Sequence, residues 1–70
     1  MQTESTIKLT DRQHEILYWA SRGKTSWSIG KILGISENTV QYHFKNILSM
    51  FAVSSRQEAI ARAIRMQLIE

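Results

Sequence analysis

The strongest indication of the fold lies in residues 32–46, which have the sequence ILGISENTVQYHFKN. Gly34 is suited to end a short helix, because glycine readily takes the left-handed conformation found at helix C-termini. Ser36 is suited to cap the next helix, and Glu37 follows where its charge complements the positive end of the helix dipole. The two helices are therefore joined by residues 34–36, a tight turn that begins with glycine. Such a turn is typical of a helix-turn-helix.

The helix that begins after Ser36 has two regular faces. Its apolar stripe consists of Val40, Phe44, Ile47, Leu48 and Phe51. Its opposite face consists of Asn38, Gln41, Tyr42, Lys45 and Ser49. Amides, a phenol and a lysine can exchange hydrogen bonds with base edges, and an aromatic edge can cover a thymine methyl. A plain amphipathic helix explains this feature alone equally well, whereas the preceding turn and the location of the charge favour DNA binding.

Capping residues mark two helices before this one. Thr10 and Gln13 form the Thr-x-x-Gln capping box of a helix expected over residues 11–22, which Gly23 ends. Thr25 or Ser26 is expected to cap a shorter second helix. The apolar side of this second helix consists of Ile29, Ile32 and Leu33.

A fourth helix is expected after Val53, where Ser55 and Glu58 form a second capping box. Its apolar surface comes from Ala59, Ile60, Ala63, Ile64 and Met66. One apolar face has to pack on the first helix. The remaining apolar surface is explained either by contact with a second copy of the chain or by the core of a small domain.

The composition indicates one small domain with its positive charge in the middle. The chain has 70 residues, 43% of them hydrophobic, and a formal net charge of +3. Residues 22–45 contain Arg22, Lys24, Lys31 and Lys45 against Glu37 alone, so this window carries the whole excess. A localised basic patch indicates a polyanionic partner, either nucleic acid or a membrane surface. A merely solubilising surface is the alternative.

The sequence also excludes several classes of protein. There is no cysteine, which rules out a disulfide scaffold and a thiolate metal site. His14 and His43 lack the spacing of metal ligands, and no catalytic constellation is present, so we expect neither an enzyme nor a cofactor. Residues 1–8 lack the apolar stretch of a signal peptide, and no segment is apolar enough to span a membrane. We therefore expect a soluble, cytoplasmic protein without a membrane partner.

Three segments resemble the DNA-binding domain of LuxR-type transcription factors. They are residues 9–12 (LTDR), residues 23–27 (GKTSW) and residues 32–46. This domain is shared by bacterial quorum-sensing regulators and by response regulators of the NarL/FixJ type, and the resemblance covers Leu9 to Ile69. Trp19 and Trp27 favour the quorum-sensing branch. Residues 1–8 are then a flexible N-terminal segment or linker remnant, and residues 9–70 are the domain.

The resemblance implies an all-α, four-helix bundle that contains a helix-turn-helix. Its third helix would enter the major groove as the recognition helix, and its fourth would form a homodimer. The implied base contacts are Gln41 to adenine, Tyr42 to a thymine methyl or a phosphate, and Lys45 to guanine. The implied backbone contacts are Lys24, Thr25, Ser26, Thr39, His43 and Asn46. The implied dimer interface contains Glu58, Ala61, Arg62 and Arg65.

The chain departs from the family pattern at three positions. Gln13 stands where the family usually has glutamate, so a neutral hydrogen bond is expected there in place of an ion pair. Ala52 stands where the family often has glycine or asparagine, and Gln67 where it commonly has glycine. Both are turn positions at which a left-handed conformation is easier for glycine or asparagine.

The sequence thus predicts a sequence-specific DNA-binding domain of a bacterial transcription regulator. It is expected to bind double-stranded DNA with an inverted repeat as a homodimer, and Trp27 is a candidate contact for RNA polymerase. No small-molecule ligand is expected in this chain, since the residues before Leu9 are too few for a sensor domain. The chain is then either a stand-alone regulator or a fragment of a longer one. The alternative function is a small basic helical module that binds another protein.

Overall fold

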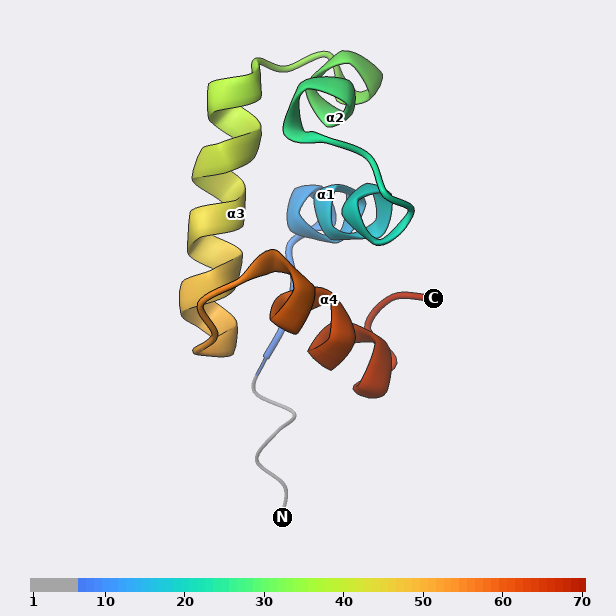
Figure 1. Ribbon diagram of the computed structural model, residues 1–70, viewed down its shortest axis with the longest axis vertical. Coiled ribbons are helices and arrows are strands. Elements are labelled where there is room, and N and C mark those ends of the chain that lie inside the picture. Colours follow the sequence, from blue (N-terminus) through green and yellow to red (C-terminus); the bar gives the residue numbers. More distant parts are fainter. Residues whose placement is uncertain (1–6) are drawn as a thin grey trace.

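Four α-helices form the part of the chain that the computed structural model describes, residues 7–70 (Figure 1). They are α1 (Asp11–Ser21), α2 (Ser26–Leu33), α3 (Glu37–Phe51) and α4 (Arg56–Arg65). The long helix α3 runs along one side of the molecule, and α1, α2 and α4 all pack against α3 (Figure 1). The predicted all-α, four-helix fold is confirmed. The expected flexible segment 1–8 lies outside the described residues, apart from its last two.

The core forms where α3 faces the other three helices. From α3 it contains Val40, Phe44, Ile47 and Phe51, while Leu48 is only partly buried. From the rest of the chain it contains Ile16, Leu17, Ala20, Ile29, Ala59, Ala63 and Ile69. The five polar residues predicted for the opposite face of α3 are all exposed. The predicted division of α3 into two faces is therefore confirmed, and its polar side chains lie at the surface.

The turn between α2 and α3 has the predicted geometry. Gly34 is left-handed, with φ 74° and ψ 31°, and ends α2. The backbone N–H of Ile35 donates to the Gly30 carbonyl at 2.9 Å. Ser36 caps α3, since its hydroxyl accepts the backbone N–H of Thr39 at 3.0 Å. These local bonds hold the two helices of the helix-turn-helix in a defined relative orientation.

Capping at α1 follows the predicted pattern, and α2 resolves the alternative left open. The Thr10 N–H donates to the Gln13 side chain at 3.0 Å, and the Gln13 N–H donates to the Thr10 hydroxyl at 3.1 Å. Helix α1 ends one residue earlier than predicted, because Arg22 has left helical geometry at φ −92° and ψ 10°. Thr25, not Ser26, caps α2 by accepting the backbone N–H of Ser28 at 3.1 Å.

The start of α4 differs from the capping box that was predicted there. The Ser55 hydroxyl accepts the Glu58 N–H at 3.1 Å, as expected. The Glu58 carboxylate reaches one residue further back and accepts the backbone N–H of Ser54 at 3.1 Å. It also accepts the hydroxyls of Ser54 and Ser55. The Ser54 N–H and these hydroxyls lower the pKa of Glu58 below its ordinary value.

The backbone is left-handed at Ala52 and Gln67, the two turn positions where the family pattern favours glycine. Ala52 follows α3 with φ 58°, and Gln67 follows α4 with φ 62°. At the end of α3, the Val53 N–H donates to the Leu48 carbonyl at 3.1 Å, the bond typical of a Schellman motif. The expectation of left-handed turns at these two positions is confirmed, and their side chains hold a conformation that glycine would adopt with less strain.

Candidate nucleic-acid interface

The exposed face of α3 carries the three side chains predicted to read bases. Gln41, Tyr42 and Lys45 are all exposed, and the Tyr42 side chain retains 62% of its accessible surface. The Tyr42 ring packs edge-on against the His43 ring, with 5.7 Å between centroids. Gln41 donates to the Glu37 carboxylate at 3.4 Å. The helix therefore presents donors, acceptors and an aromatic ring on one solvent-facing surface.

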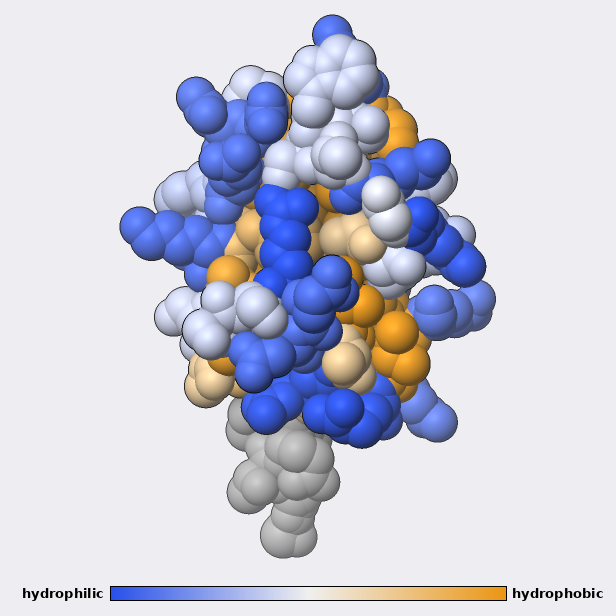
Figure 2. All heavy atoms as spheres, in the orientation of Figure 1, coloured by the Kyte–Doolittle hydropathy of each residue, from blue (hydrophilic) through white to orange (hydrophobic). Residues whose placement is uncertain are grey.

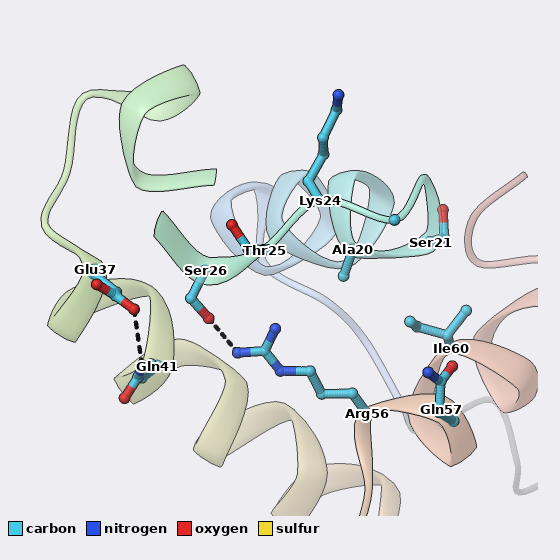
Figure 3. Close-up of a pocket in the computed structure, with 11 residues that line it drawn as sticks. Ala20, Ser21, Lys24, Thr25, Ser26, Glu37, Gln41, Arg56, Gln57 and Ile60 are labelled. Carbon is cyan, nitrogen blue, oxygen red and sulfur yellow. Dashed lines mark hydrogen bonds between the residues drawn. The ribbon is translucent and has the colours of Figure 1, made fainter. Parts of the chain in front are cut away.

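The loop before α2 adds a positive charge close to this face. Lys24 and Thr25 are exposed, and the Lys24 side chain extends away from the body of the domain (Figure 3). Both residues line a hollow that also includes Gln41 of α3 (Figure 3). The structure thus places predicted backbone contacts and a predicted base contact around one surface depression.

Ser26 does not fit its predicted role. Its side chain is buried, with 6% of its surface accessible, and its hydroxyl accepts a hydrogen bond from the Arg56 guanidinium. As the first residue of α2, it faces inward toward α4 (Figure 3). The Ser26 hydroxyl therefore links α2 to α4 and is not exposed for the predicted phosphate contact.

Arg56 is the main residue of this region that the sequence analysis missed. Its guanidinium lies 4.2 Å from the centre of the Phe44 ring and donates to Ser26, so it contacts both helices of the helix-turn-helix. It also lines the hollow, together with Gln57 (Figure 3). A positive charge at the first residue of a helix opposes the helix dipole. That unfavourable position was the one signal in the sequence that Arg56 is held by tertiary contacts.

The other residues predicted to contact the DNA backbone lie on α3, beside its exposed polar face. Thr39 and His43 are half-buried, and Asn46 is exposed. The Thr39 hydroxyl lies 2.9 Å from the Ser36 hydroxyl in the N-terminal cap. The spacing of 39, 43 and 46 puts these three residues on one side of the helix. They lie beside the three side chains that are predicted to read bases.

The residues predicted for a dimer interface lie on α4, but two of them already have partners. Glu58 caps its own helix, and Arg62 donates to the Phe51 carbonyl at 3.0 Å. Ala61 and Arg65 are exposed, and between them Ile64 is 46% exposed. Figure 2 shows hydrophobic residues among hydrophilic ones in the region of α4 and the C-terminal segment.

A second apolar surface lies on α2. It includes Ile32, which was predicted to lie on the apolar side of that helix. Ile29 is buried, but Ile32, predicted for the same apolar side, is 45% exposed. Trp27 is 59% exposed, and the Lys31 ammonium lies 5.2 Å from the centre of its ring. Helix α2 buries Ser26, Ile29 and Gly30, and the Gly30 backbone lies close to the turn before α3. Ile32 and Trp27 are left at the surface.

Two helices joined by a tight glycine turn, with a polar face on the second and a basic loop before the first, define a helix-turn-helix DNA-binding domain. Residues 7–63 match the family model described as "Bacterial regulatory proteins, luxR family". The chain belongs to the LuxR family of bacterial regulatory proteins. The predicted family and fold are confirmed, and the family is one of regulatory proteins and not of enzymes. No helix within residues 7–70 has the length and apolar character needed to cross a membrane.

Several known proteins are similar to this chain. It is 44% identical over 66 residues to the transcriptional activator protein SolR of Ralstonia nicotianae, covering 94% of the chain and 28% of SolR. It is 44% identical over 61 residues to the transcriptional activator protein LuxR of Aliivibrio fischeri, covering 87% of the chain and 24% of LuxR. The solved structure of the transcription factor GerE matches with a TM-score of 0.86 and 34% identity, over 89% of this chain and 92% of that one. The chain thus spans about a quarter of the length of these two curated relatives.

Proposed function

We propose that this domain binds an inverted-repeat DNA site as a homodimer and directs a bacterial transcription regulator to that site. The observation that carries the proposal is the exposed polar face of α3, which adjoins the hollow lined by Lys24 and Thr25. A helix of this width fits the major groove of B-DNA, whereas the basic loop suits the phosphates at the groove edge. The DNA lies in the cytoplasm of a bacterium, where we expect the protein to act.

The base-reading side chains have distinct chemical roles in this proposal. Lys45 donates to the O6 and N7 acceptors of guanine, and Gln41 pairs with adenine. Tyr42 covers a thymine methyl or donates to a phosphate. The backbone contacts that set the register are proposed for Lys24, Thr25, Thr39, His43 and Asn46. Of these, Lys24 neutralises a phosphate and releases counterions, so its contribution depends on salt.

The proposed dimer forms through α4. Its interface is proposed to contain Glu58, Ala61, Arg62 and Arg65. Ile64, an apolar residue that is 46% exposed, would lie at its centre. An isologous contact between two copies of α4 would bury this apolar surface and relate the two recognition helices by a two-fold axis. The two copies of α3 would then enter major-groove segments about 34–36 Å apart.

Selection from a random duplex library at moderate salt tests this proposal directly. We expect enrichment of an inverted repeat whose half-sites are centred about one helical turn apart. Enrichment of single half-sites would support DNA binding and contradict dimerisation by this domain alone. If no sequence is enriched and binding does not weaken with salt, the proposed function is wrong, and a protein-interaction module becomes the better hypothesis.

We also propose that α2 contacts a protein partner, RNA polymerase, through Trp27. The indole and the neighbouring Ile32 are exposed apolar groups on the helix that precedes the recognition helix. Replacing Trp27 by alanine is expected to leave DNA affinity within about twofold while lowering transcription from a promoter that carries the selected site. Gel-shift titration and reconstituted transcription measure the two effects. Parallel loss of both would contradict a polymerase contact.

The domain is proposed to belong to a longer regulator of the quorum-sensing type. Support comes from its likeness to the transcriptional activators SolR and LuxR, of which it spans only about a quarter. Trp19 and Trp27, which resemble that branch, are further support. In such a regulator, a sensor elsewhere in the protein would control whether this domain reaches its DNA site.

A further inference from the structure

Glu37 and Gln41 contact each other at the start of the recognition helix. The Gln41 amide nitrogen donates to the Glu37 carboxylate at 3.4 Å, across one turn of α3 (Figure 3). Both side chains are exposed and line the hollow that Lys24 and Thr25 also line. Within residues 7–70 the one ion pair joins Arg12 to Glu15, so Glu37 has no cationic partner there. Its carboxylate is therefore free to act on the Gln41 side chain.

The carboxylate decides which way the Gln41 amide faces. An ionised carboxylate only accepts hydrogen bonds, whereas an amide offers two N–H donors and one carbonyl acceptor. If the amide were rotated by 180°, its carbonyl oxygen would face the carboxylate without a proton between them. In the structure, the amide nitrogen of Gln41 accordingly faces Glu37, and its oxygen faces away from the carboxylate. Exclusion of water on DNA docking strengthens this preference.

This orientation selects between the two purines. Adenine presents N7 as an acceptor and the N6 amino group as a donor, which match the remaining N–H and the carbonyl of Gln41. Guanine presents two acceptors, N7 and O6. An amide with one N–H already given to Glu37 can satisfy only one of these and places its oxygen against the other. A freely rotating glutamine would discriminate less.

We infer that Glu37 is a specificity-determining residue that sets Gln41 to accept adenine and to reject guanine. The inference rests on the proposed function and extends it, since it assigns a role to an acidic residue at the edge of a surface that binds a polyanion. A carboxylate there opposes phosphate binding, so it weakens affinity for all sequences alike. The contact between Glu37 and Gln41 instead increases selectivity at one base pair.

Glu37 also complements the dipole of α3, and a matched pair of variants separates this effect from base selection. Glu37→Asp keeps the negative charge at the helix N-terminus but withdraws the carboxylate by one methylene from a contact with Gln41 that is already 3.4 Å long. Glu37→Ala removes both the charge and the contact. Gln41→Ala identifies the base pair that Gln41 reads. Glu15→Ala, on the exposed face of α1, controls for the loss of one acidic residue.

The experiment is selection from the same random duplex library with all five proteins. We expect the wild-type protein and Glu15→Ala to enrich adenine at one position in each half-site, and Gln41→Ala to lose that preference. At this same position, Glu37→Ala and Glu37→Asp should both lower the adenine-to-guanine ratio roughly tenfold. Circular dichroism checks that helix content is unchanged.

Three results would overturn the inference while leaving DNA binding intact. The ratio at the position assigned to Gln41 could stay the same in both Glu37 variants. The changed position could be a different base pair, in which case Glu37 reads a base itself. The wild-type protein could enrich a base other than adenine where Gln41→Ala has its effect. If the wild-type protein enriches no sequence, the proposed function fails and the inference fails with it.

Discussion

Replacing Gly30 by alanine is expected to lower the free energy of unfolding by about 1–3 kcal/mol and to reduce DNA affinity at least about tenfold. A methyl group at this position would lie 2.6 Å from the carbonyl oxygen of Ile35 and 3.4 Å from the backbone nitrogen of Glu37. These are backbone atoms of the turn and of the first residue of α3, so they cannot move aside as a flexible side chain could. The gain in helix propensity, about 1 kcal/mol, is smaller than the effect of the clash.

The matched control is Gly34→Ala, four residues along the same segment. Gly34 has φ 74° and open space where a methyl group would be placed, so alanine there is strained but does not separate the helices. We expect a loss of about 1 kcal/mol in stability and near wild-type affinity for DNA in the folded protein. Urea unfolding followed by circular dichroism and binding to the selected site measure both quantities. A Gly30→Ala protein at least as stable as wild type would show that the two helices do not need this close approach.

The features that the sequence predicted correctly are those whose partners lie within a few residues. The caps at Thr10 and Ser36 bond to residues three positions along, as does Thr25, one of the two caps that the sequence allowed for α2. The turn at Gly34 needs only its own conformation. The two faces of α3 follow from its period. The left-handed conformation of Ala52 was indicated by the resemblance, since the family often has glycine or asparagine at that position.

The features that sequence reasoning missed depend on packing between distant segments. Ser26 reads as a cap residue, but it is buried and accepts a hydrogen bond from Arg56, which lies 30 residues further along the chain. Ile32 fits the apolar side of α2 by spacing, yet it is 45% exposed. Helical periodicity states which residues share a face but not how that face is turned toward its neighbours. The surroundings of the candidate interface therefore required the tertiary structure.

Replacing Lys45 by alanine is expected to weaken binding to the selected DNA site by about 1–3 kcal/mol and to abolish the preference at one base pair in each half-site. Lys45 lies on the exposed face of α3, one turn beyond Gln41. In the proposed complex Lys45 reaches the guanine edge in the major groove. Its loss should therefore lower affinity most for the selected DNA site. Affinity for random duplexes should fall much less. Titration of both duplexes over a range of salt concentrations gives the ratio of specific to non-specific affinity.

Lys24→Ala removes the same charge from the loop before α2 and serves as the matched control. Because Lys24 is proposed to contact a phosphate, its loss should weaken binding to all sequences by a similar factor and reduce the salt slope by about one. The two lysine variants have equal net charge, and both lysines are exposed in the free protein. The variants therefore differ only in where the charge was removed. If Lys45→Ala lowers specific and random binding by the same factor, Lys45 contacts the backbone. The base-reading surface would then be confined to the first two turns of α3.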